Sequence, residues 1–156
     1  MRVVIDTDVL VSGLRSAAGA SRVILLGVRE RVLIPLLSVA MLLEYEAVLK
    51  RSATLAATGL VAADVDVFLD AWAGMAEAVP RGFSHRPAIM DPDDELFLQA
   101  AINGGAAALI TFNVGDYRPA DDRAAGHGVA VVRPGAFLRR LAWRPSTTSL
   151  FAFRPN

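Results

Sequence analysis

The chain contains no cysteine, only two histidines and a single lysine among its 156 residues. The absence of cysteine excludes disulfides, thiolate-bound zinc and a cysteine nucleophile. The two imidazoles, His85 and His127, are too few for a histidine-rich metal centre. The placement of the acidic residues therefore matters most for any metal or catalytic chemistry.

The sequence also lacks an apolar run long enough to cross a bilayer. Met1-Arg2 leads straight into a short apolar strand, without the longer apolar stretch and cleavage site of a signal peptide. With 54% hydrophobic and 21% charged residues, the composition is typical of a compact globular protein. We expect one soluble, cytoplasmic domain over residues 1–142, with no membrane partner, followed by a tail over 143–156 that is flexible or forms an interface.

The formal net charge is zero, so the whole molecule is not an obvious polyanion binder. The charges are unevenly distributed, because residues 91–95 hold four acids whereas residues 133–156 hold five arginines and no acid. Fifteen of the sixteen cations are arginine, which suits bidentate contacts to phosphate.

Short apolar segments alternate with helical patterns along the chain. This alternation predicts an α/β fold whose central sheet of about five strands is mainly parallel and covered on both faces. Ser38 is a plausible N-cap, Pro35 should stop the second strand, and Gly104-Gly105 should end a helix. The expected strands are 2–5, 32–34, 77–79, 106–111 and 129–132, and the expected helices are 9–17, 20–29, 39–50, 62–73, 93 or 94 to 103, and 135–141.

Two carboxylates, Asp6 and Asp8, follow the first apolar strand directly. Asp8 has a ready explanation as the N-cap of the next helix. Asp6 extends the buried run, where a carboxylate is costly unless it is paired, hydrogen-bonded or bound to a metal. Active sites in parallel sheets gather where strands end, so Asp6 is the stronger candidate for function.

Three further acids have similar settings. Glu44 lies within an apolar helix, Asp94 lies at a helix start, and Asp116 follows the fourth strand. Each has a simpler reading, as a solvated helix face, a cap and a turn residue respectively. If these acids converge with Asp6 at the carboxyl edge of the sheet, they form an oxygen-rich site suited to Mg²⁺ or Mn²⁺.

Four segments in order resemble the motifs of the PIN domain, the fold of many metal-dependent ribonucleases, including the toxins of VapC-type toxin–antitoxin pairs. The resemblance covers residues 2 to about 141 and implies a three-layer α/β/α sandwich. The segments are Val3-Val-Ile-Asp6-Thr-Asp-Val-Leu, Ser38-Val-Ala-Met-Leu-Leu-Glu44, Asp91-Pro-Asp-Asp94-Glu-Leu-Phe, and Leu109-Ile-Thr111-Phe-Asn113-Val-Gly-Asp116-Tyr117. A fifth, Val131-Val-Arg-Pro134-Gly-Ala-Phe137-Leu, is similar to the closing strand and helix of a subgroup regarded as toxins.

The resemblance implies a role for each matched residue. Asp6, Glu44, Asp94 and Asp116 would be catalytic and would hold the metal, with Asp116 acting directly or through water. The surrounding positions would support them: Asp8, Asp91, Thr111 and Asn113. It also implies an RNA substrate, an inhibitory antitoxin partner, and a homodimer or higher homo-oligomer.

The surface that would face RNA is predicted from the arginines. Arg15 and Arg22 are candidates for phosphate contact, as are arginines 133, 139, 140 and 144. The C-terminal arginines fit a solvated helix and tail equally well. Trp143, Phe151 and Phe153 would suit self-association or an antitoxin.

Two alternatives remain open from the sequence. The segment ending in Asp6-Thr-Asp8 also resembles the first motif of haloacid dehalogenase-like phosphatases, where the first Asp is a nucleophile and the second a general acid. That family needs a lysine after a later strand-end hydroxyl, but Lys50 precedes Thr111. The other alternative is a PIN-like module that binds RNA or protein without cleaving, which the filled acidic positions speak against.

Overall fold

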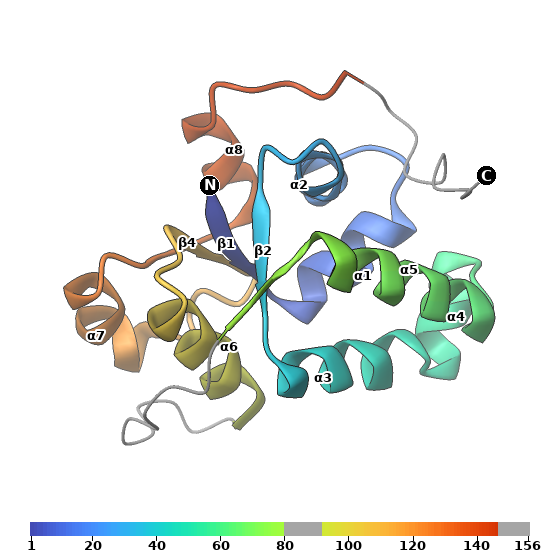
Figure 1. Ribbon diagram of the computed structural model, residues 1–156, viewed down its shortest axis with the longest axis horizontal. Helices are drawn as coiled ribbons and strands as arrows, with labels where there is room; N and C mark the ends of the chain where they lie inside the picture. Colours follow the sequence, from blue (N-terminus) through green and yellow to red (C-terminus); the bar gives the residue numbers. More distant parts are fainter. Residues whose placement is uncertain (80–91, 147–156) are drawn as a thin grey trace.

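The computed structural model describes residues 1–79 and 92–146, and within them five strands form one parallel sheet in the order β3-β2-β1-β4-β5. Every pairing between neighbouring strands is parallel, and β1 lies at the centre (Figure 1). The strands are β1 (Arg2–Ile5), β2 (Ile34–Leu37), β3 (Glu77–Ala78), β4 (Ala108–Ile110) and β5 (Ala130–Val132).

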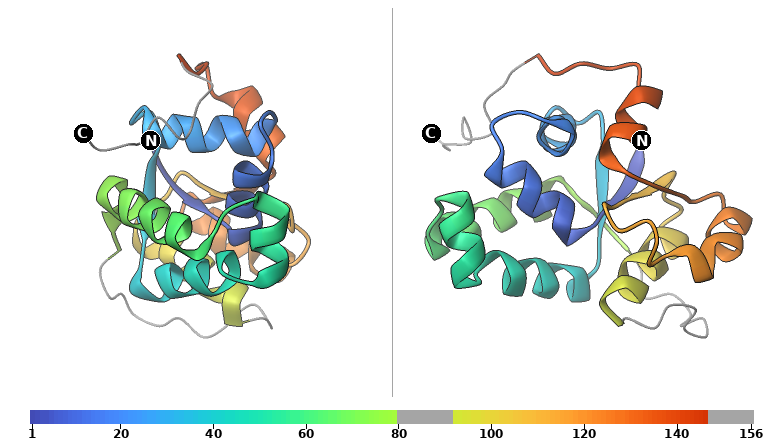
Figure 2. Two further views of the ribbon diagram at one scale, coloured as in Figure 1. Left: turned by 90° about the vertical axis from the view of Figure 1, so that its right-hand side faces the viewer. Right: turned by 180° about the vertical axis from the view of Figure 1, so that it is seen from behind.

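Helices cover both faces of this sheet, so the predicted α/β/α sandwich is confirmed. Helices α1, α2, α4 and α5 lie on one side, and α6 and α7 lie on the other (Figures 1 and 2). The helices are α1 (Thr7–Arg15), α2 (Ala20–Arg29), α3 (Val39–Leu49), α4 (Ser52–Thr58), α5 (Ala62–Met75), α6 (Pro92–Asn103), α7 (Asp121–Gly126) and α8 (Pro134–Arg140), with a 3₁₀ turn η1 at Arg118–Ala120.

The central strand explains why the sheet needs two covering layers. Val3, Val4 and Ile5 are all fully buried, so successive side chains on both faces of β1 are removed from water. A strand buried on both faces has a continuous apolar sequence rather than an alternating one. The strand then ends at Asp6, which makes the carboxyl edge of β1 the point where the core meets a charge.

The predicted second strand was wrong in its boundaries. The strand runs from Ile34 to Leu37 and contains Pro35, which was expected to stop it. At Pro35, β2 is paired with β1 alone, because β3 pairs only with Leu36 and Leu37. Proline, which has no N–H to donate, is tolerated at such an edge position of a sheet. Ser38 then caps α3 as predicted, with its hydroxyl accepting from the Met41 N–H at 3.2 Å.

Two helical segments were not predicted from the sequence. Helix α4 has the sequence Ser-Ala-Thr-Leu-Ala-Ala-Thr and buries none of its residues, so it has no apolar periodicity to reveal it. It ends at Gly59, whose φ of 71° is the left-handed conformation that favours glycine. The other is the short η1–α7 segment between β4 and β5. The loop predicted over residues 80–92 lies mostly outside the described residues.

Close packing of α1 on α2 depends on the lack of a side chain at Gly13. A β-carbon there would lie 2.6 Å from Leu25 Cδ1 and 3.1 Å from the backbone oxygen of Ser21. The two helices are joined by a short connection and bent sharply, by 97°, so they touch at this point.

The segment after α8 returns to α2. The ring of Trp143 lies against Gly27, and the backbone N–H and hydroxyl of Ser146 both donate to Glu30 Oε1, at 2.9 and 2.7 Å. The first residues of the predicted tail are therefore fastened to the domain, whereas residues 147–156 lie outside the described part.

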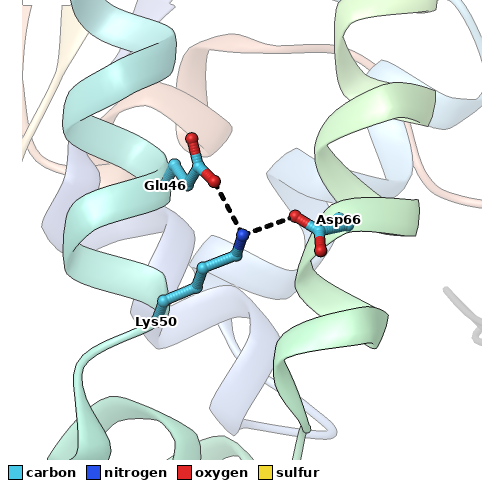
Figure 3. Close-up of polar contacts among 3 residues, drawn as sticks. All are labelled: Glu46, Lys50 and Asp66. Carbon is cyan, nitrogen blue, oxygen red and sulfur yellow. Dashed lines mark hydrogen bonds and ion pairs between the residues drawn. The ribbon is translucent and has the colours of Figure 1, made fainter.

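The single lysine links α3 to α5 (Figure 3). Lys50 Nζ lies 2.6 Å from both Glu46 Oε1 and Asp66 Oδ1. These hydrogen bonds raise the pKa of Lys50, that to Asp66 most. All three groups are substantially exposed, so these ion pairs contribute little to the free energy of unfolding. They connect the end of α3 to α5.

Within the described ranges, no single helix is long and apolar enough to cross a membrane. Two pairs of consecutive helices, α1 with α2 and α4 with α5, reach the length and apolar composition of a membrane span only when each pair is counted as one segment, and each pair is sharply bent.

Substitution of Gly13 by alanine should destabilise the protein by about 1–3 kcal/mol, because Leu25 and the Ser21 carbonyl leave no room for a methyl group. Gly74→Ala on α5 is the matched control, since a β-carbon there meets nothing within 4 Å. It should gain up to about 1 kcal/mol from reduced backbone entropy. Urea unfolding of both variants measures the difference, and equal stabilities would contradict the packing argument.

Candidate active site at the carboxyl edge of the sheet

Asp6 is both the last residue of the β1 pairing and the N-cap of α1. Its backbone N–H donates to the Ile110 carbonyl at 2.9 Å, which continues the β1–β4 ladder. Its Oδ1 accepts from the Thr7 N–H at 2.7 Å, which satisfies one of the free donors at the helix start. The side chain is 7% exposed, so a charged group is held at the boundary of the core.

Two buried hydroxyl groups complete the surroundings of this carboxylate. The Tyr117 hydroxyl donates to Asp6 Oδ2 at 3.3 Å, and the Thr111 hydroxyl also donates to the Asp6 carboxylate. Thr111 was predicted to support the site, whereas Tyr117 was quoted only as part of a motif. The aromatic residue directly after Asp116 was the signal that could have assigned Tyr117 a role.

The charge state of Asp6 reflects a conflict between burial and hydrogen bonding. Burial raises the pKa of Asp6 to about 6, and the negative charge of Asp8 adds to this effect. Hydrogen bonds from Thr111, Thr7 and Tyr117 act in the opposite direction but do not cancel it. The anionic form therefore costs more here than at an exposed aspartate, and a nearby positive charge would offset that cost.

The predicted capping role of Asp8 was wrong. Helix α1 begins at Thr7 rather than Val9, so the cap falls on Asp6 and Asp8 lies in the first turn. Asp8 Oδ2 instead accepts from the Phe112 N–H at 3.1 Å. It fixes the loop after β4 next to the start of α1, and it places a second carboxylate beside Asp6.

A pocket of about 600 Å³ opens beside these two carboxylates. Helix α1 supplies one wall, because residues spaced three and four apart lie on one face of a helix. Helix α4, which the sequence did not reveal, contributes Thr54. The residues that line the pocket are Asp6, Thr7, Asp8, Val11, Ser12, Arg15, Glu44, Val48, Thr54, Phe97 and Phe112.

Glu44 reaches the pocket because its neighbour anchors α3 to the sheet. The hydroxyl of the fully buried Tyr45 donates to the Ile5 carbonyl, one residue before Asp6. The Tyr45 ring also lies against Phe97 of α6, with ring centroids 5.7 Å apart. Burial first, and then the charge of Asp6, raise the pKa of Tyr45 well above its usual value, so this hydroxyl remains a donor.

Some predicted residues do not join this cluster. Asp116 and Asn113 are exposed on the loop after β4, where the Asp116 N–H donates to the Asn113 carbonyl, and neither lines the pocket. Arg15 lines the pocket, whereas Arg22 is only 8% exposed and is placed elsewhere on α2. The structure thus brings together Asp6, Asp8, Glu44 and Arg15.

The third predicted acid cannot be placed at the level of its side chain. Asp94 belongs to the first turn of α6, but its side chain is not described, and Asp91 lies outside the described residues. Glu95, which was not among the predicted site residues, is buried and accepts from the Gln99 amide at 3.2 Å.

The donors that line the pocket fit a hard divalent cation in their chemistry. They are carboxylate and hydroxyl oxygens, and the buried hydroxyl of Thr7 has no hydrogen-bond partner among the described atoms. A cation would also offset the repulsion between Asp6 and Asp8. Over residues 1–79 and 92–146, with the side chains of Asp93, Asp94, Asp121 and Asp122 left out, no three acidic or histidine side chains already lie close enough to hold a metal.

The raised pKa of Asp6 predicts a pH-dependent stability. Protonated Asp6 contributes to the free energy of unfolding, and this contribution is fully present below the unfolded pKa of 3.8. It is lost as the pH rises through the folded pKa of about 6, which lowers the free energy of unfolding by about 3 kcal/mol. Without metal, Asp6→Asn should therefore be more stable than wild type near neutral pH, and the difference should shrink near pH 4. Urea unfolding in chelator at both pH values measures it. A difference independent of pH would contradict the assignment.

The comparisons with known proteins agree with the geometry at the family level. The model of the PIN domain family matches residues 2–115, which include β1 through β4 and the Asp6 site. Searches of curated proteins and of solved structures returned no match. The family match favours a nuclease-like protein that acts on nucleic acid, and it leaves the phosphatase alternative without support. The chain belongs to the PIN domain family.

Proposed function

We propose that this protein is a metal-dependent endoribonuclease that hydrolyses RNA phosphodiester bonds in the pocket beside Asp6. The observation that carries the proposal is a buried carboxylate of raised pKa that shares an open pocket with Asp8 and Glu44. A carboxylate in that setting is costly to keep charged, and a bound cation is the chemistry that offsets the cost.

The residues have distinct roles in this proposal. Asp6, Glu44 and Asp94 would hold Mg²⁺ or Mn²⁺, and Asp116, which is exposed and does not line the pocket, would act through water. When bound there, a divalent cation would supply an activated water and would neutralise charge on the phosphate oxygens. Thr111 and Tyr117 orient the Asp6 carboxylate through their hydroxyls, and Asp8 fixes the loop after β4 at the edge of the site.

We further propose that the protein is the cytoplasmic toxin of a toxin–antitoxin pair and that it acts as a homodimer or higher homo-oligomer. The similarity of residues 131–138 to the closing strand and helix of a toxin subgroup supports this role. Growth arrest on expression, relieved by a short neighbouring reading frame, would support the toxin role, and unchanged growth would count against it.

Purified protein should cleave single-stranded RNA only with Mg²⁺ or Mn²⁺, and EDTA should abolish cleavage. Asp6→Asn and Glu44→Gln should each lower the cleavage rate by about 100-fold or more, because each removes a carboxylate charge that would hold the metal, and the metal in turn would neutralise charge on the reacting phosphate. Glu46→Gln is the matched control, since Glu46 lies on the same helix but pairs with Lys50 outside the pocket. Full activity of Asp6→Asn would refute the proposed site, and RNA binding without cleavage by wild type would indicate a non-catalytic module.

Metal should stabilise the wild-type protein and not Asp6→Asn. At a metal concentration about 100 times its dissociation constant, the gain should be about 2.7 kcal/mol. Thermal unfolding with and without Mn²⁺ measures this gain directly. The same stabilisation in both proteins would place the ion elsewhere on the molecule.

A further inference from the structure

The pocket has an aromatic rim that the cleavage chemistry does not use. Phe112 lines the pocket yet is 40% exposed, and it is the one aromatic residue among the exposed large apolar side chains of the described ranges. It does not belong to the core cluster or to the partly buried residues packed on it. The fold therefore gains little from this ring, and an exposed phenyl group beside a polar site needs another explanation.

Hydrogen bonds of the backbone hold Phe112 in place. Its N–H donates to Asp8 Oδ2 at 3.1 Å, and the following N–H, of Asn113, donates to Thr111 Oγ1 at 3.0 Å. Thr111 in turn donates to Asp6. The backbone that carries the ring is thus fixed relative to the Asp6 and Asp8 carboxylates. Because the backbone that carries this pocket-lining ring is already anchored, less of the chain has to be ordered when a ligand stacks on it.

The pocket continues from the acids toward a positive charge. Asp8, Ser12 and Arg15 lie on one face of α1, and Arg15 is about 10 Å along the helix axis from Asp8. The exposed guanidinium of Arg15 suits a phosphate. A chain with repeated anionic groups fits a pocket with a cation-binding end, an arginine end and an aromatic rim better than a small phosphoester does.

We propose that Phe112 is a specificity-determining residue that stacks on one unpaired base of the RNA next to the cleaved bond, while Arg15 contacts a neighbouring phosphate. This inference rests on the proposed ribonuclease function. Stacking on an aromatic side chain needs a base that is splayed out of any helix, so it selects single strands over duplexes and tolerates all four bases.

The experiment measures binding separately from cleavage. Fluorescence anisotropy with a labelled single-stranded RNA of about ten nucleotides and a matched duplex is recorded in an Asp6→Asn background, so that no RNA is cut. Phe112→Ala and Phe112→Leu should weaken single-strand binding by about 5- to 100-fold and leave duplex binding unchanged. Phe112→Trp should bind within about threefold of the parent, since it keeps a π face.

Two controls separate stacking from other effects. Val67→Ala removes a more exposed apolar side chain from α5, outside the pocket, and should leave binding unchanged. Abasic nucleotides are placed one at a time along the RNA. Removal of the base at one position should weaken RNA binding by the parent protein but not by Phe112→Leu. Circular dichroism confirms that each variant is folded.

Several outcomes would overturn the inference. Phe112→Leu binding as tightly as the parent would exclude stacking, as would an equal loss on single strands and duplexes. If Phe112→Leu does not change single-strand RNA binding while the wild-type protein cleaves RNA, the stacking role fails and the proposed function stands. If wild type neither binds nor cleaves any RNA, both fail together.

Discussion

The arrangement of the site depends on one buried carboxylate. Asp6 ends the central strand, caps α1 through the Thr7 N–H, and accepts hydroxyl hydrogen bonds from Thr111 and Tyr117. Its backbone also joins the β1–β4 ladder. Because these contacts come from the start of α1 and from the end of β4 with the loop that follows it, the position of Asp6 sets where α1 begins and where that loop lies. The pocket opens beside this residue, and the start of α1 and the loop after β4 form part of its wall.

The neighbouring elements are fixed by the same strand end, which makes the site rigid. Tyr45 ties α3 to the Ile5 carbonyl, Asp8 ties the loop after β4 to α1, and the Tyr45 ring packs on Phe97 of α6. The fully buried Tyr45 hydroxyl has a raised pKa, so it donates at any physiological pH. A catalytic or binding site benefits from such support, because residues held by packing and by hydrogen bonds need not be ordered again when a ligand binds.

The sequence revealed the elements with strong local signals and missed those without them. The apolar runs of β1 and β4, the Ser38 cap and the alternation of strands and helices were enough to predict the fold. Helix α4 was missed because none of its residues is fully buried, so it has no apolar periodicity, yet it supplies Thr54 to the pocket. Asp8 was misassigned because both Asp6 and Asp8 are suitable N-cap residues by type. Only the extended backbone angles of Asp6 show that the helix begins at Thr7. Which acids converge is a property of the tertiary fold, and no spacing along the chain determines it.

The identity of residue 6 argues that its charge, and not its capping ability, matters. A helix N-cap is served as well by asparagine or serine, neither of which carries a charge into the core. Aspartate here has its pKa raised to about 6 by burial and by Asp8, so near neutral pH the fold is less stable than a neutral cap would make it. Proteins accept such a cost mainly where function needs the group. The capping contact therefore explains how Asp6 is tolerated, and the pocket beside it explains why an acid is there.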